Sequence, residues 1–245
     1  DDSISTLLCF DAKSLHLRPF GRTMRGFVVQ YTPAALPVNA PSHGGIAFLD
    51  RDGVLNIGSP NYINTPSEFV ALRKAATSVG ELRRAGFRVC VVTNQSAILR
   101  GLWDSHRLHG IHNHMRDEFL AIDEDAHFDA VLACPHRHRD RCKCRKPMPG
   151  MLRFGDRLLR QTTDYPLGES EGTLEQGDGV VDWWGEKPLP NNPVDCMVGD
   201  RNSDMGAGWA CGLRLFQVPD DVGVASHLSR ILDLSDAGDS FNPVR

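Results

Sequence analysis

The sequence contains no long apolar run, no strong excess of one charge and no cysteine pattern typical of a disulfide framework. No apolar run approaches the roughly 18 residues that are needed to span a bilayer. The net charge of -4 gives no electrostatic footprint for general nucleic-acid or membrane binding, and we expect neither as a partner. The chain begins at Asp1 rather than at a methionine, so the absence of a signal peptide carries little weight.

What is present is ordinary for a soluble globular protein. The 245 residues are 41% hydrophobic and 24% charged, which is enough to bury a substantial core. The length predicts one large domain, or one domain with appendages. The sequence has no internal repeats, and it is silent on oligomeric state.

The seven cysteines are an odd number and are unevenly spread. Cys90 and Cys196 lie inside apolar runs and have the character of small reduced core residues, whereas Cys9 and Cys211 are isolated. The other three crowd together beside a histidine: Cys134, Cys142 and Cys144 beside His136. This pattern favours a reducing compartment, which we take to be the cytoplasm, and a metal site over disulfide bonds.

Short apolar runs alternate with segments of helical spacing along most of the chain. The runs that predict strands are 46–49, 88–94, 128–133 and 194–200. The segments that predict helices are 67–85, which stops at Gly86, 104–122 and 150–160. Strands that alternate with helices predict an α/β fold with a parallel sheet. Fully apolar strands predict helices on both faces of that sheet.

The flanking segments look different from this regular part. Residues 1–45 are predicted to be an N-terminal extension and linker, which leaves 46–219 as the main domain and 220–245 as a polar tail with one short helix. Within the main domain, residues 161–193 contain seven acidic residues and one lysine. A structureless loop of about thirty residues is uncommon in a compact domain. We therefore expect an insertion that forms a lid, an oligomer contact or a mobile segment.

Polar residues follow directly after each of the four apolar runs. Taken alone, Thr93 could be a helix cap, Lys146 a solvated side chain and Asp204 a charge at a helix N-terminus. The carboxyl ends of strands form the ligand crevice in open parallel sheets, and recurrence at four strand ends predicts that these residues converge there. The residues are Asp50 and Asp52, then Thr93, Asn94 and Gln95, then Cys134, Arg145 and Lys146, and finally Asp200 and Asp204.

The chemistry of this set fits phosphoryl transfer. Asp50 and Asp200 offer the hard oxygen ligands that Mg²⁺ prefers, and a divalent cation would mask the repulsion between a carboxylate and a phosphate ester. Asp50 is ionised at neutral pH and can attack phosphorus to form an aspartyl-phosphate. Asp52 is placed to protonate the leaving oxygen and then to activate water. Thr93 and Lys146 can hold the phosphoryl oxygens as charge builds in the transition state.

Four motifs in this order resemble those of the haloacid dehalogenase (HAD) superfamily of phosphatases: DRDGV from Asp50, TNQS from Thr93, RKP from Arg145, and GDRNSD from 199 to 204. The resemblance covers residues 46–218. It implies a Rossmann-like, doubly wound core with Mg²⁺ on Asp50, on the backbone carbonyl of Asp52 and on Asp200, with Asp204 as a further candidate. The gaps between the motifs leave no room for a cap domain, so substrate choice must depend on loops around an open site.

The loop 134–150 carries a candidate zinc site. Three thiolates and one imidazole within eleven residues satisfy a closed tetrahedral Zn²⁺ site of the structural kind, with Cys134, His136, Cys142 and Cys144 as ligands. The alternative is three reduced cysteines near a solvated loop. The stretch HRHRDR (136–141) also invites a nucleic-acid interpretation, but a solvated turn accounts for it more economically.

Four histidines cluster between the second and third predicted strands: His106, His109, His112 and His114. They could suggest a second metal site. Their spacing on one predicted helix indicates instead a face that is exposed to solvent.

The zinc loop on a capless core resembles the D-glycero-D-manno-heptose 1,7-bisphosphate phosphatases and the related histidinol-phosphate phosphatases. FLDRDGVLN and CRKPMPGML look like the heptose enzymes. The resemblance implies that Arg145 contributes to substrate recognition, and we expect Asn94, Gln95 and Ser96 to bind substrate as well. The short spacing between His136 and Cys142, and the pair Asp200-Arg201, look more like the histidinol enzymes.

The leading hypothesis is therefore a Mg²⁺-dependent phosphatase that acts on a small sugar bisphosphate. Histidinol-phosphate hydrolysis is the alternative enzyme function. A nucleic-acid end-processing phosphatase and a non-catalytic binding protein are more remote alternatives. The four acidic and basic residues of the motifs speak against the last, because folding alone does not require Asp50, Asp52, Lys146 and Asp200 together.

Overall fold

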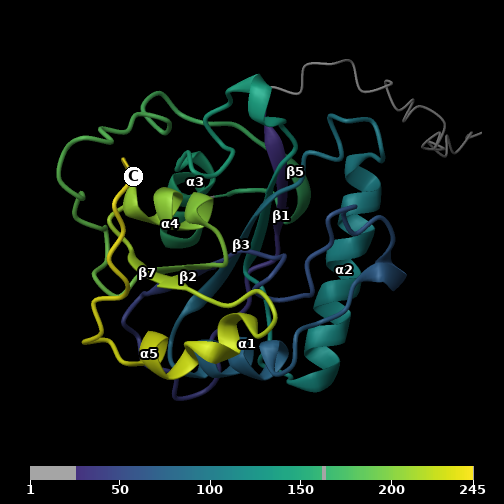
Figure 1. The fold of residues 1–245 in the computed structure, drawn as a ribbon. Coiled ribbons are helices and arrows are strands. Elements are labelled where there is room, and N and C mark those ends of the chain that lie inside the picture. The colour runs from purple at the N-terminus through teal and green to yellow at the C-terminus, as the bar shows by residue number, and fades with distance from the viewer. Residues whose placement is uncertain (1–25, 162–163, 245) are drawn as a thin grey trace, which may run out of the picture.

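A seven-stranded sheet in the order β5-β1-β4-β3-β2-β6-β7 forms the centre of the molecule (Figure 1). The computed structural model describes residues 26–161 and 164–244. Cys9 and the first 25 residues of the predicted extension lie outside these ranges. None of the helices in the described ranges is long and apolar enough to cross a membrane.

Five neighbouring strands are parallel, and four of them correspond to the predicted apolar runs. They are β2 (Ile46–Leu49), β3 (Arg88–Asn94), β4 (Ala130–Cys134), β6 (Cys196–Gly199) and β7 (Arg214–Gln217). β2 lies between β3 and β6, with Phe48 opposite Cys90 on one side and Met197 on the other. β7 was not predicted from the sequence, and it extends the sheet beyond β6.

Two antiparallel strands complete the sheet, which is therefore mixed rather than purely parallel. β1 (Phe27–Tyr31) pairs with β4, and β5 (Gly168–Gly172) pairs with β1 at the edge. β1 comes from the predicted extension and β5 from the predicted insertion. The domain boundaries stay a prediction, but the extension and the insertion each contribute one strand to the main sheet.

Helices cover both faces of the sheet (Figure 1). α1 (Ala75–Arg84), α2 (Ser105–Ile122) and α5 (Leu228–Leu232) pack on one face, where Ala47 and Leu49 of β2 point. α3 (Gly150–Arg160) and α4 (Asn202–Trp209) pack on the other, where Ile46 and Phe48 point. Three short 3-10 helices lie in loops: η1 (Pro66–Glu68), η2 (His138–Asp140) and η3 (Gly223–Ser226).

The helix predicted over 67–85 is wrong in its first half. α1 begins only at Ala75, because Lys74 has a positive φ of 66° that interrupts the helical backbone. Phe69 and Leu72 are nevertheless buried in the core. Their backbone is extended, with the Leu72 amide donating to the Leu55 carbonyl at 2.9 Å. The spacing of the apolar residues therefore indicates burial of Phe69 and Leu72, but the helix that it predicts over 67–74 is wrong.

The predicted insertion is fixed to the body of the protein at several points after β5. Arg157 of α3 forms an ion pair with Asp178, at 2.6 Å between Nη1 and Oδ1. The Trp183 ring stacks on Trp209 of α4 with 6.0 Å between centroids. The short helix predicted for the C-terminal tail is α5, which follows η3.

Candidate active site

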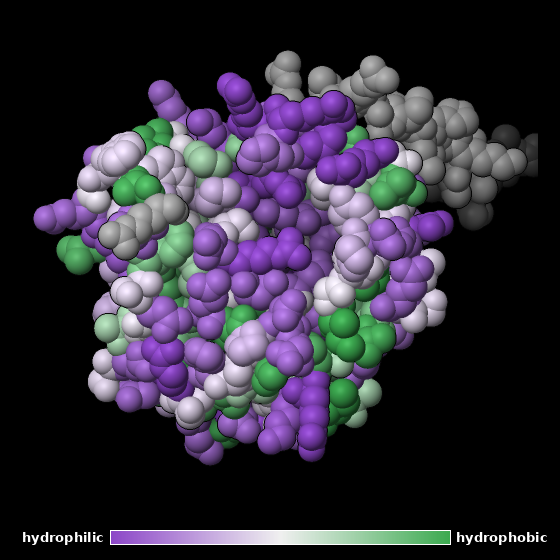
Figure 2. Space-filling view, viewed as in Figure 1, coloured by the Kyte–Doolittle hydropathy of each residue, from purple (hydrophilic) through white to green (hydrophobic). Residues whose placement is uncertain are grey.

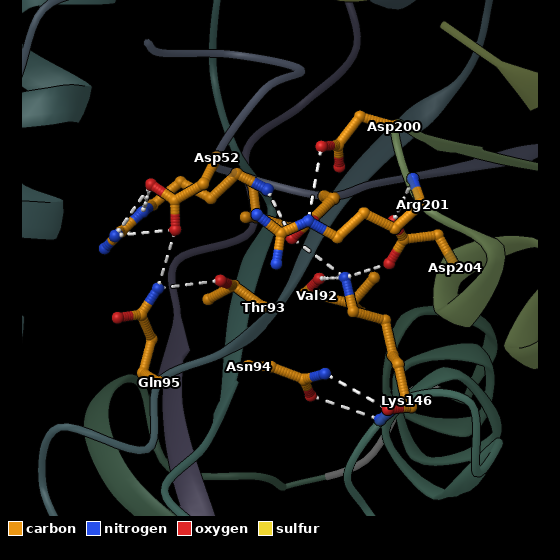
Figure 3. Close-up of polar contacts among 12 residues, drawn as sticks. Asp52, Val92, Thr93, Asn94, Gln95, Lys146, Asp200, Arg201 and Asp204 are labelled. Atoms are coloured by element: carbon orange, nitrogen blue, oxygen red, sulfur yellow. Dashed lines mark hydrogen bonds and ion pairs between the residues drawn. The ribbon is translucent and has the colours of Figure 1, made fainter. Parts of the chain in front are cut away.

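Three carboxylates and one lysine meet at the carboxyl ends of the parallel strands (Figure 3). Lys146 Nζ lies 2.8 Å from Asp50 Oδ1 and 2.7 Å from Asp204 Oδ1, and it donates a hydrogen bond of 2.6 Å to the Val92 carbonyl. One carboxylate oxygen from each of Asp50, Asp200 and Asp204 lies within 4.8 Å of the others. The predicted convergence of these residues is therefore present in the geometry.

Backbone contacts and two glycines allow this close approach. The Asp50 amide donates to the Val198 carbonyl of β6 at 2.9 Å, which ties the end of β2 to its neighbour. Gly53 has a φ of +79°, and a Cβ there would lie 2.8 Å from Asp200 Cγ. A Cβ at Gly199 would lie 2.2 Å from Asp204 Cβ. Any side chain at either glycine would push an acidic residue out of place.

Burial shapes the ionisation of the cluster. It raises the pKa of Asp50 to about 6, although Lys146 opposes the shift, and Asp204 and Asp52 add to it. Burial also raises the pKa of Asp200, with the Asp50 charge as the next cause. For Lys146, burial alone would lower the pKa, but Asp204 and Asp50 outweigh it and the pKa is raised. The lysine is therefore charged and shared between two carboxylates.

Asp52 is held by three donors. The Arg51 Nη2 group lies 3.0 Å from both carboxylate oxygens, Asn56 Nδ2 donates to Oδ1 at 3.0 Å, and Gln95 Nε2 donates to Oδ2 at 3.0 Å. Burial alone would raise the pKa of Asp52, but Arg51 and these hydrogen bonds outweigh it and lower the pKa. Arg51 and Asn56 were not predicted as site residues, although Arg51 lies between the two motif acids.

The side chains of the TNQS segment mainly hold other residues of the site in place. Gln95 Nε2 also donates to Thr93 Oγ1 at 2.9 Å, so this amide joins Thr93 to Asp52. Asn94 exchanges two hydrogen bonds of 3.1 Å with the Lys146 backbone. Ser96 Oγ lies 3.1 Å from the Tyr62 hydroxyl. The predicted substrate-binding roles of Asn94, Gln95 and Ser96 stay predictions, and their contacts here hold other site residues in place.

The acidic residues fit a magnesium ion. Asp200 Oδ1 is buried and has no hydrogen-bond partner among the described residues, and such an orphaned oxygen suits a cation. Asp204 Oδ1 is also buried without a hydrogen bond among the described residues, but it lies 2.7 Å from the charged Lys146 Nζ, and Asp204 Oδ2 accepts a 3.1 Å hydrogen bond from the Arg201 amide. Asp50 and Asp200 are therefore the stronger candidates, and Asp204 holds the lysine.

The four predicted zinc ligands form a compact cluster beside the site. Cys144 Sγ lies 3.3 Å from Cys134 Sγ, 3.5 Å from Cys142 Sγ and 3.2 Å from His136 Nδ1. A Zn²⁺ ion with bonds of about 2.3 Å to sulfur holds its ligands about 3.8 Å apart, so these spacings fit a tetrahedral metal. The Arg145 amide donates to Cys142 Sγ at 3.3 Å, and its guanidinium donates to the His136 carbonyl at 3.0 Å.

Two of the four clustered histidines do not face solvent, which corrects that expectation. His109 and His112 are buried, because α2 turns them toward β5 and β1. His109 Nδ1 pairs with Glu169 of β5 at 2.5 Å. His112 Nδ1 lies 2.8 Å from Gln30 Oε1 of β1. The local spacing could not reveal these partners, because they come from strands far away in the sequence.

The sheet, together with the carboxylates and the lysine that follow β2, β4 and β6, defines a phosphatase of the HAD class. A D-glycero-beta-D-manno-heptose-1,7-bisphosphate 7-phosphatase from Pseudomonas aeruginosa is 32% identical over 183 residues, which are 75% of this chain and 97% of that relative. The chain belongs to this family of HAD phosphatases. It is therefore an enzyme that hydrolyses phosphate esters, and the predicted membership and class are confirmed.

Other comparisons agree. A relative of the same name from Pseudomonas putida is 39% identical over 132 residues, which are 53% of this chain and 74% of that relative. The D,D-heptose 1,7-bisphosphate phosphatase of Bordetella bronchiseptica, solved with magnesium and phosphate, has a TM-score of 0.55 and 27% identity over 79% of this chain and 90% of that one. A HAD-like phosphatase from Mesorhizobium loti has a TM-score of 0.62 over 89% of this chain at 24% identity, which supports the fold alone. No family model matches the chain.

Proposed function

We propose that this phosphatase acts on D-glycero-D-manno-heptose 1,7-bisphosphate and removes the phosphate at C7. The membership of the chain in the heptose-bisphosphatase family carries the proposal. A second support is the charge beside the active site, which suits a substrate with two phosphates. Histidinol-phosphate hydrolysis, the alternative from the sequence, has a substrate with one phosphate and a cationic end.

In the first step Asp50 attacks the phosphorus atom. An Asp50 oxygen–phosphorus bond forms while the ester bond to the sugar oxygen breaks, and Asp52 donates its proton to that oxygen. Mg²⁺ bound by Asp50, Asp200 and the Asp52 carbonyl would offset the negative charge of the phosphate. Lys146 keeps Asp50 oriented through the 2.8 Å contact. Arg51 lowers the pKa of Asp52 in the enzyme without substrate. We propose that the negative charge of the entering phosphate raises this pKa again, so that Asp52 takes up the proton that it later donates.

In the second step water releases the phosphate. Asp52, now ionised, takes a proton from a water molecule whose oxygen attacks phosphorus, and the bond to Asp50 breaks. Phosphate leaves, and both acids return to their starting states. Thr93 and Lys146 remain the proposed partners for the phosphoryl oxygens.

Two neighbouring cavities suit the phosphate that is not hydrolysed. Cavities of about 970 and 470 Å³ share a wall formed by η2, and no acidic side chain among the described residues lines either one. Figure 2 shows strongly hydrophilic residues around the central hollow of this face and along its upper edge. The basic lining residues are Arg100, Arg137, His138, Arg139, Arg141, Lys143, Arg145 and Lys146. Arg137 is paired with Asp140, and Lys146 with Asp50 and Asp204. The other basic side chains still leave a local excess of positive charge in a protein of net charge -4, and this excess attracts a second phosphate and repels the ammonium group of histidinol phosphate.

The direct test compares phosphate release from the heptose bisphosphate and from histidinol phosphate. We expect a clear preference for the bisphosphate, and a preference for histidinol phosphate would contradict the proposal. Arg139→Ala should raise KM for the bisphosphate without changing hydrolysis of p-nitrophenyl phosphate, which has no second phosphate. Arg73→Ala, at an exposed arginine outside both cavities, is the matched control.

We also propose Zn²⁺ as the occupant of the Cys/His cluster. The four buried or half-buried ligand residues and their spacings support a closed structural site, and Zn²⁺ there would stiffen the loop that presents Arg145 and Lys146. None of the six described cysteines forms a disulfide bond. Because thiolate ligands require a reducing environment, a cytoplasmic location is part of the proposal.

A further inference from the structure

A chain of buried polar side chains leads from Asp52 to Gln30 of β1, the strand next to the edge of the sheet. Arg51 Nη1 lies 3.3 Å from His112 Nε2, and His112 Nδ1 lies 2.8 Å from Gln30 Oε1. Gln30 Nε2 then donates to Asn113 Oδ1 at 3.1 Å. Arg51, His112 and Gln30 are 1%, 0% and 2% exposed. None of the motifs contains His112 or Gln30.

The donors and acceptors in this chain fix the state of His112. An arginine side chain can only donate hydrogen bonds, so His112 Nε2 must be the acceptor and carry no proton. The same ring must then donate from Nδ1 to Gln30 Oε1. Burial, together with the charge of Arg51, lowers the pKa of His112 well below its usual value. His112 is therefore a neutral ring with its proton on Nδ1.

This anchor acts on the group that holds the acid/base. The Arg51 guanidinium uses Nε and Nη2 for Asp52 and Nη1 for His112. Without the anchor, a long flexible arginine beside the site could turn toward a bound phosphate, because guanidinium groups bind phosphate readily. Asp52 would then lose its strongest partner and be held only by Asn56 and Gln95.

We propose that His112, supported by Gln30, is a positioning residue that keeps the Arg51 guanidinium on Asp52 and so orients Asp52 for proton transfer. The inference rests on the proposed acid/base role of Asp52. A purely structural role would instead be the burial of matched polar groups between α2 and β1. The two can be separated, because only a positioning role makes the defect depend on the proton needed by the leaving group.

The test uses two substrates with different leaving groups. His112→Leu removes both hydrogen bonds, and His112→Gln supplies one acceptor and one donor in their place. With the sugar bisphosphate we expect His112→Leu to lower kcat about 10-fold, part of the about 10²–10⁴-fold worth of a general acid/base, with KM unchanged. The initial burst of p-nitrophenolate from p-nitrophenyl phosphate should be retained, because that leaving group needs no proton. His112→Gln should recover most of kcat.

The control is His114→Ala on the exposed side of the same helix, which should leave both rates unchanged. The proposal fails if His112→Leu lowers kcat for the sugar bisphosphate and the rate of the p-nitrophenolate burst to the same extent. It also fails if the variant lowers neither. The proposed function is tested separately, because its failure would appear as turnover without Asp50 or as a preference for histidinol phosphate.

A second measurement does not depend on activity or on the folding of His112→Leu. The ¹⁵N shifts of the histidine rings in the wild-type protein report which nitrogen carries the proton, and the signals absent from His112→Gln identify His112. We expect a neutral ring protonated at Nδ1 at about pH 7. A proton on Nε2 would show that Arg51 is not its donor, and the proposal would fail.

Discussion

Lys146 and Asp50 are in contact through a 2.8 Å ion pair in which both side chains are almost wholly buried. The same ammonium group is 2.7 Å from Asp204, so one positive charge serves two carboxylates. A buried lysine is tolerated only where such partners compensate for its lost hydration. The nucleophile, its lysine and the acid that holds the lysine are therefore one electrostatic unit.

Lys146→Met should destabilise the protein strongly, because it leaves Asp50 and Asp204 buried without their cation. Loss of one partner of a buried pair costs about 3–5 kcal/mol, and we expect a fall of this size in the free energy of unfolding in urea. Mg²⁺ should raise the melting temperature of the variant more than that of the wild type, since it can replace the missing charge. Lys143→Met, on the exposed part of the same loop, is the control, and equal losses in the two variants would contradict the expectation.

Asp50→Asn should keep the fold and abolish turnover. Asparagine has nearly the same shape, but its amide oxygen is too poor a nucleophile to attack phosphorus. We expect kcat to fall by at least about 1,000-fold, with far-ultraviolet circular dichroism unchanged. Asp221→Asn, at an exposed position in the C-terminal tail, should be fully active. Substantial activity in Asp50→Asn would remove Asp50 as the nucleophile.

The parts of this fold that could be predicted from sequence are those that depend on neighbours in the chain. The segment VCVV (89–92) of β3 is apolar without interruption because the strand is covered on both faces, so this run itself predicts a buried strand. The polar residues at strand ends were predictable for a related reason, since parallel strands bring their carboxyl ends to one edge. That rule places Asp50 and Asp200 together, whereas Lys146 reaches Asp50 from the loop that follows β4.

The parts that were missed depend on contacts between distant segments. His112 meets Gln30 across 82 positions of sequence and Arg51 across 61, and no local pattern distinguishes it from the exposed His114. β5 was not expected because its sequence, GESEG, is polar, and it is a strand only because β1 offers a free edge. The prediction that a helix begins at residue 67 was wrong for a similar reason. Phe69 is buried by distant segments, and its position in the sequence resembles helical spacing.

Gly53→Ala tests whether the turn after Asp50 makes room for Asp200. The variant combines an unfavourable backbone at φ +79° with a Cβ only 2.8 Å from Asp200 Cγ. Gly177→Ala is the matched control, because its φ is +101° and nothing lies within 4 Å of its Cβ. We expect each to lose about 1 kcal/mol or more of unfolding free energy, but only Gly53→Ala to lose phosphatase activity and Mg²⁺ affinity. Equal phosphatase activities of Gly53→Ala and Gly177→Ala would contradict this expectation and would show that Asp200 can move aside without loss of function.

Zinc content tests the Cys/His cluster. We expect freshly purified protein to contain one equivalent of zinc by elemental analysis, and Cys144→Ser to lose it together with part of its thermal stability. Cys211→Ser, at a half-buried cysteine outside the cluster, should keep the metal. Zinc below about half an equivalent in the wild type, or equal loss in both variants, would contradict the assignment.

The ion pair between Asp178 and Arg157 should make the attachment of the insertion depend on pH. Burial alone would raise the pKa of Asp178, but hydrogen bonds from Arg157 and from the Glu175 amide outweigh it and lower the pKa. A carboxyl whose pKa is lower in the folded state stabilises the protein above its unfolded pKa of about 3.9. This stabilisation is lost as the pH falls through the folded pKa.

Urea unfolding of the wild type and of Asp178→Asn at several pH values measures this contribution. We expect the wild type to be the more stable at about pH 7, and the difference to shrink as the pH is lowered from about 4 toward 3. Asp164→Asn, at an exposed position in the same insertion, should show little difference at any of these pH values. A difference between wild type and Asp178→Asn that stays constant down to about pH 3 would mean that ionised Asp178 does not hold the insertion against α3.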